Sequence, residues 1–135
     1  MKASRLLFAL LFEIVACSSS SGSGLNSGEL VVALSSSDQA ALCDWWASQY
    51  GGYGNSVKCG GGVLAPPPQS GPTDRGTCVA GLPKASTAPN CGATVQNYQN
   101  CITAKVKNCG TDTTLPFDCN AIKSSLCVTS AADGG

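Results

Sequence analysis

The 135-residue chain contains no histidine, and only 12% of its residues are charged. Without histidine, the chain has no Ser-His-Asp triad and no imidazole general base. Eight Lys and Arg residues balance eight Asp and Glu residues, so the chain lacks the excess of basic charge on which nucleic-acid binding depends. We therefore expect no nucleic-acid partner.

Closely spaced cysteines and catalytic signatures are also absent. No Cys-x-x-Cys pair occurs, which argues against zinc knuckles and thioredoxin-like redox sites. The chain has no Gly-x-Ser-x-Gly or Ser-x-x-Lys signature, and its glycine runs lack the Lys-Ser/Thr ending of a phosphate loop. We expect no enzyme activity, no metal and no cofactor; a small carbohydrate-active enzyme with two carboxylates is an alternative.

The first 16 residues have the pattern of an export signal. Lys2 and Arg5 precede a short apolar run, which is too short for a membrane-spanning helix. The following Ile14-Val15-Ala16-Cys17 resembles a bacterial lipobox, and this resemblance implies cleavage before Cys17 and its acylation. Glu13 departs from the pattern, and an ordinary secretory signal is the alternative.

The composition divides the rest of the chain into three parts. Residues 17–28 are predicted to be the lipidated cysteine and a flexible Ser/Gly tether. Residues 29–130 are predicted to form the folded domain, and residues 131–135 a disordered tail. No aspartate follows Cys17, and by resemblance to enterobacterial lipoproteins this implies the outer membrane; free secretion is the alternative.

Eight cysteines remain beyond Cys17, and an even number permits four disulfides. In an exported chain of this size, disulfides substitute for a large hydrophobic core. We expect the disulfides Cys59–Cys78, Cys109–Cys119 and Cys43–Cys101. Two cysteines ten or eight residues apart on one intact helix are too distant for a disulfide, which excludes Cys91–Cys101 and Cys119–Cys127. The predicted disulfide cysteines are Cys43, Cys59, Cys78, Cys91, Cys101, Cys109, Cys119 and Cys127.

The spacing of apolar residues predicts a mainly α, small disulfide-rich fold of about three helices with long Gly/Pro-rich loops. The first helix is expected over residues 38–50, with Ser36 and Gln39 as a capping box. The second is expected to begin after an N-cap at Asn90 and to end at Cys109. The third is expected over residues 114–127. Residues 30–34 are either a short strand or a segment that packs on the helices. Residues 56–64 have room for a short β-hairpin, and residues 75–88 are expected to be irregular.

Two adjacent tryptophans occupy the first predicted helix. Trp46 shares helical spacing with Leu42 and Tyr50 and is expected in the core, whereas Trp45 lies about 100° away on the flank. Trp45, Tyr50 and Tyr53 form a candidate aromatic patch for a glycan or a protein. The alternative is that Trp45 packs beneath the Gly/Pro-rich loop.

Several short motifs resemble those of small cysteine-rich predicted lipoproteins of myxobacteria. They are Cys43-Asp44-Trp45, Gly51-Gly52-Tyr53-Gly54, Cys59, and the segment from Ala93-Thr94-Val95 to Cys101. The resemblance implies location and architecture and assigns no catalytic residue. We expect an exported, lipid-anchored protein of the bacterial cell envelope with a binding or structural role. Its partners would be the membrane and a protein or glycan ligand; the alternative is a freely secreted inhibitor or toxin-like effector.

Overall fold

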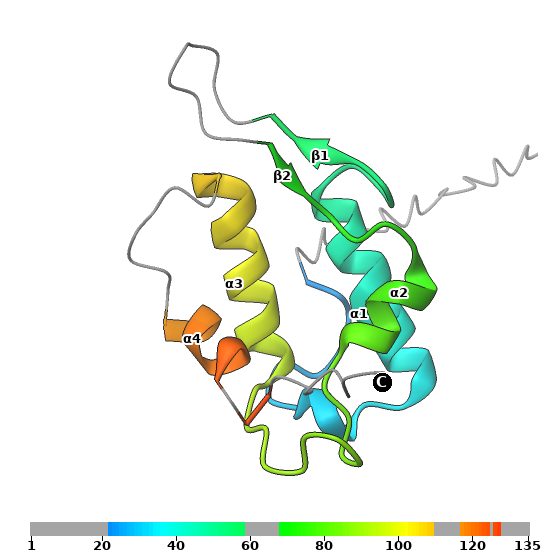
Figure 1. The fold of residues 1–135 in the computed structure, drawn as a ribbon, viewed down its shortest axis with the longest axis vertical. Helices are drawn as coiled ribbons and strands as arrows, with labels where there is room; N and C mark the ends of the chain where they lie inside the picture. Colours follow the sequence, from blue (N-terminus) through cyan, green and yellow to red (C-terminus); the bar gives the residue numbers. More distant parts are fainter. Residues whose placement is uncertain (1–21, 59–67, 110–116, 125, 128–135) are drawn as a thin grey trace, which may run out of the picture.

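The computed structural model describes residues 22–58, 68–109, 117–124 and 126–127. These residues form four α-helices and one antiparallel pair of short strands, which confirms the predicted mainly α, disulfide-rich fold class (Figure 1). The export signal, Cys17, Cys59 and the predicted tail lie outside the described residues. The elements are α1 (Ser36–Gln49), β1 (Ser56–Val57), β2 (Gln69–Ser70), α2 (Arg75–Gly81), α3 (Val95–Asn108) and α4 (Phe117–Lys123).

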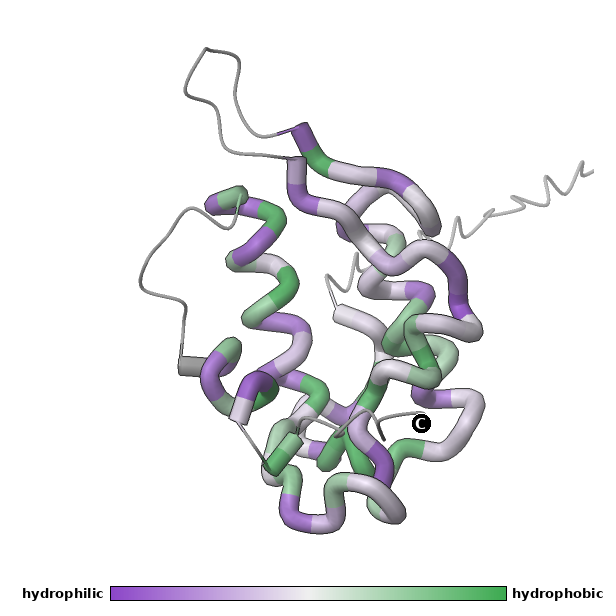
Figure 2. Tube along the Cα trace, in the orientation of Figure 1, coloured by the Kyte–Doolittle hydropathy of each residue, from purple (hydrophilic) through white to green (hydrophobic). Residues whose placement is uncertain are grey.

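The helices lie in the spatial order α2, α1, α3, α4 (Figure 1). Polar and apolar residues alternate along α3 (Figure 2), because one side of this helix faces the core and the other faces solvent. Tyr98 of α3 is buried, and this burial raises the pKa of its phenol to about 12. The core also includes Val31, Leu42, Leu82, Val95 and Ile102.

Three disulfides join described cysteines, and each one links neighbouring elements. Cys43 of α1 is bonded to Cys78 of α2, and Cys101 of α3 is bonded to Cys119 of α4. Cys91, just before α3, is bonded to Cys127, just after α4. The three bridges therefore hold two helix pairs together, α1 with α2 and α3 with α4.

All three predicted pairings are wrong: Cys59–Cys78, Cys109–Cys119 and Cys43–Cys101. Two of them fail because α2 occupies a segment predicted to be irregular and brings Cys78 against Cys43 of α1. The Cys109–Cys119 pairing fails because α4 packs on α3 and places Cys119 against Cys101. The expectation that neither Cys91–Cys101 nor Cys119–Cys127 forms is confirmed. Cys109 is also disulfide-bonded, and its partner lies outside the described residues.

The helix starts differ from the predicted ones because other side chains satisfy the first N–H groups. Ser35, not Ser36, caps α1 by accepting from the Asp38 N–H. In α3, Thr94 and Asn97 form a reciprocal capping box, four residues after the predicted cap at Asn90. The first helix is confirmed within two residues, whereas α3 begins later than predicted.

Two shorter helices were harder to predict from the sequence. Asp74 caps α2, and its carboxylate accepts from both the N–H and the hydroxyl of Thr77. The third predicted helix, over residues 114–127, is confirmed only as α4, which ends at Lys123. A hairpin forms as expected after α1, but its second strand lies at residues 69–70, beyond the predicted range of 56–64.

Residues 22–30, which we call the strap, lie against α3, although most of them were predicted as tether. The carbonyls of Ser27 and Glu29 accept from the N–H groups of Gln96 and Val95, each at 2.9 Å. These bonds satisfy two of the four N–H groups that a helix leaves without an internal partner at its start. The strap is therefore part of the fold. A 3₁₀-helix over Val31–Ala33 follows it, in the segment for which the sequence left two alternatives open.

Replacing both Cys101 and Cys119 with alanine is expected to lower the free energy of unfolding by about 3 kcal/mol, because the unfolded chain regains the entropy of an 18-residue loop. The double replacement of Cys43 and Cys78, which are 35 residues apart, is expected to cost about 4 kcal/mol by the same relation. Urea denaturation followed by circular dichroism measures both changes. Unfolding midpoints equal to that of the parent protein would contradict this assignment.

Candidate functional site

A groove of about 600 Å³ lies between the C-terminal halves of α1 and α3. This volume is within the range of small-ligand sites in proteins. Four of its side chains are amides and one is a hydroxyl, and Trp45 is the aromatic residue of the lining. The lining residues are Gly22, Trp45, Gln49, Gln99, Asn100, Thr103, Ala104, Lys107 and Asn108.

Helical periodicity explains why these residues share one surface. Positions four residues apart lie on the same face of a helix. Trp45 and Gln49 have this spacing on α1, and two such series occupy α3: 99, 103 and 107, and 100, 104 and 108. Because α1 and α3 run side by side in the same direction, their faces form the two walls of the groove (Figure 1).

Neighbouring elements orient two amides in the α3 wall. The Gln99 Nε2 donates to the Ser23 Oγ of the strap at 2.8 Å. The Asn100 Nδ2 donates to the Asp118 Oδ2 of α4 at 3.2 Å. Each amide also has a carbonyl oxygen, so the wall offers both donors and acceptors. In the part of the chain that the structure describes, Lys107 is the only charged side chain that lines the groove.

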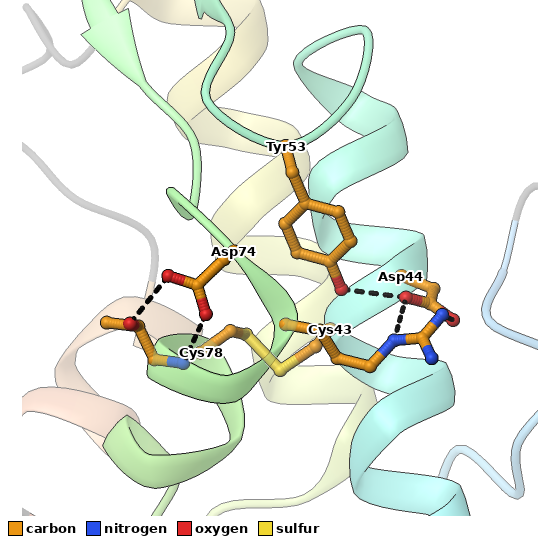
Figure 3. The surroundings of a disulfide bond; sticks show 7 residues. Cys43, Asp44, Tyr53, Asp74 and Cys78 are labelled. Carbon is orange, nitrogen blue, oxygen red and sulfur yellow. Dashed lines mark hydrogen bonds and ion pairs between the residues drawn. A yellow bond between two sulfur atoms is a disulfide. The ribbon is translucent and has the colours of Figure 1, made fainter.

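The three aromatic residues predicted as one patch do not form one. Trp45 is only 8% exposed and lines the groove. Tyr50 is buried, because the loop backbone at Gly71 passes directly over its ring. Tyr53 instead directs its hydroxyl to Asp44 (Figure 3). Only Trp45 of the predicted patch therefore belongs to the candidate site.

The prediction that Trp45 lies on the flank of the apolar side of α1 is wrong, because Trp45 is buried. Trp46 packs against the core, as predicted, but it is only partly buried and also lines a smaller pocket of about 250 Å³ together with α2 residues such as Thr77 and Cys78. The reason is that α1 packs between two helices. Trp45 faces α3 and Trp46 faces α2, so the apolar surface of α1 is not a single stripe.

Asp44 forms a polar cluster beside the Cys43–Cys78 disulfide (Figure 3). Its carboxylate accepts from the Tyr53 hydroxyl at 2.7 Å and from two nitrogens of Arg75 at 2.8 and 2.7 Å. These bonds, from Tyr53 first and then Arg75, lower the pKa of Asp44. The cluster ties the loop after α1 and the start of α2 to α1.

Sequence reasoning did not identify this cluster, although Asp44 lies in the Cys-Asp-Trp motif and Tyr53 in the Gly-Gly-Tyr-Gly motif. Gly51, Gly52 and Gly54 all have positive φ, between 73° and 120°, which non-glycine residues rarely adopt. This backbone turns the chain after α1 so that Tyr53 can reach Asp44. The two motifs therefore have a structural explanation that connects them.

The described residues contain no group of three or more metal-ligating side chains. Among these same residues, no helix combines the length and apolar character that crossing a membrane requires.

Comparisons with known proteins identify no relative: no family model matches the chain, and neither a curated protein nor a solved structure matches it.

Acidification is expected to destabilise the protein partly through Asp44. Its folded-state pKa lies below the value near 3.9 of an unfolded chain, so its stabilisation is present above about pH 4 and is lost as the pH falls through the folded-state value. In Asp44→Asn, the melting temperature should be a few degrees lower at pH 7 and should fall less between pH 5 and pH 2.5. Thermal melts across this range measure both effects.

Tyr53→Phe is the matched control, because it removes one hydrogen bond from the same carboxylate and keeps the bonds to Arg75. It should give an intermediate pH dependence. Melting curves of Asp44→Asn that run parallel to those of the parent protein at every pH would contradict the role given to Asp44.

Proposed function

We propose that the protein is an exported, lipid-anchored domain of the bacterial cell envelope that binds a saccharide in the groove between α1 and α3. The observation that carries the proposal is the lining of this groove, which combines four amides and a hydroxyl with one tryptophan. The proposal includes no reaction and no cofactor.

The chemistry of the lining favours a polyhydroxylated ligand. Each sugar hydroxyl both donates and accepts a hydrogen bond, and an amide side chain does the same with its NH₂ and carbonyl groups. Trp45 is only 8% exposed, so it offers the apolar part of a sugar ring a small apolar contact and no open ring face. The described residues of the lining include no carboxylate, so an acidic saccharide would meet no like charge among them.

The sequence supports the anchor. Cys17 directly follows an apolar run and a lipobox-like tripeptide. Acylation of its sulfur would exclude it from any disulfide. Among the nine cysteines, the proposal then leaves Cys59 as the partner of Cys109.

Expression of the full chain in a Gram-negative host tests the anchor. The mature protein is expected to begin at Cys17, to carry acyl chains by intact mass, and to partition into detergent. Cys17→Ser should abolish both the added mass and the partitioning. A parent protein that is cleaved elsewhere and carries no acyl chain would refute the anchor and favour the freely secreted alternative.

Saturation-transfer NMR with the acylated mature protein and a panel of neutral and acidic oligosaccharides tests the groove. We expect at least one saccharide to bind. Ala104→Trp should weaken this binding roughly tenfold or more, because the indole fills the space between the helices. Ala85→Trp is the matched control, since Ala85 is exposed in a turn and does not line the groove.

Circular dichroism and thermal melts establish that both variants keep the fold. If no saccharide in the panel binds, or if Ala104→Trp binds as tightly as the parent protein, the groove is not a saccharide site.

A further inference from the structure

The start of the strap lies in the wall of the groove. Gly22 is a lining residue, and a Cβ atom at this position would lie 3.4 Å from the Gln99 side chain. The strap is held there by the bond from Gln99 to Ser23 and by Leu25, which packs against the core. The chain that leads to the lipid therefore joins the domain at the groove.

Only four residues separate Cys17 from Gly22. Five Cα–Cα steps of an extended chain span at most about 18 Å. A folded domain of about 100 residues has a radius of gyration near 13 Å, and thus a diameter of about 34 Å. The groove wall is then held within about half a domain diameter of the lipid, so the side of the domain that carries Gly22 is the side nearest the point of attachment.

We propose that the groove opens toward the membrane that holds the Cys17 lipid, and that its ligand is the saccharide headgroup of a lipid in that membrane. This inference rests on the proposed anchor and saccharide site, and it adds the direction of the groove and the source of the ligand. Among the described residues of the lining, Lys107 is the only charged one, and its positive charge would attract an anionic lipid surface.

The anchor and the site act together in this arrangement. A headgroup in the same membrane is present at a high effective concentration for a groove that a short chain holds near the surface. A longer tether would let the domain rotate and would remove this advantage while leaving the intrinsic affinity of the groove unchanged.

The test uses the acylated mature protein in nanodiscs with ¹³C-labelled alanine methyl groups. A lipid with a nitroxide headgroup is expected to broaden the Ala104 methyl signal in the groove more than the Ala85 signal in the exposed turn after α2. Broadening that is equal at both positions, or stronger at Ala85, would overturn the proposed orientation.

The matched variant carries 20 additional Gly and Ser residues between Ser21 and Gly22, so every described residue is unchanged. It should bind a free oligosaccharide as the parent does. In nanodiscs that contain digalactosyl diacylglycerol, however, the parent should reach half-saturation of the Ala104 shift at a roughly tenfold lower glycolipid fraction than the variant.

The outcomes separate this inference from the proposed function. Equal half-saturation in both proteins, or binding of free saccharide without any response to the glycolipid, would refute the membrane-facing groove and leave the saccharide site standing. A mature chain without acyl groups, or a groove that binds no saccharide in either form, would refute the proposed function and this inference together.

Discussion

Disulfide bonds between adjacent helices are the constraint on which the rest of this structure depends. One bridge joins α1 to α2 and two join the α3 region to the α4 region. Helices of seven residues, such as α2 and α4, are too short to be stable alone. Each is covalently attached to a 14-residue helix, so a chain with few large apolar side chains can still keep its core closed.

None of these three bridges crosses from α1 to α3. The core residues and the strap hold this contact, and the strap caps the first turn of α3. Ligand sites commonly occur where two packed units meet, and the groove lies along this contact. The strap, which leads toward Cys17, also forms part of the groove wall. In the proposed arrangement, this one segment would determine how far the domain lies from its membrane and in which direction the groove opens.

The sequence was sufficient where a local signal decided the structure. The first helix, the hairpin after it and the disulfide-rich character followed from helical spacing, glycine-rich turns and cysteine number. The cysteine pairing did not, because it depends on how short helices pack: α2 brings Cys78 to Cys43, and α4 brings Cys119 to Cys101. The burial of Trp45 depends on α1 having helices on two sides. The order of residues 22–28 depends on hydrogen bonds to α3, which a Ser/Gly-rich composition does not predict.

A disulfide map of the mature protein tests the central claim most directly. Digestion without reduction at slightly acidic pH, with trypsin and chymotrypsin together, separates the eight cysteines beyond Cys17 from one another, because Tyr98 and Phe117 lie between those that trypsin leaves on one peptide. Cys17 stays on the peptide of Cys43, and the acyl mass identifies it there. Mass spectrometry should find the linked pairs Cys43–Cys78, Cys91–Cys127 and Cys101–Cys119, with Cys59–Cys109 as the fourth. A bridge from Cys78 to Cys59, or from Cys109 to Cys17, would contradict the account.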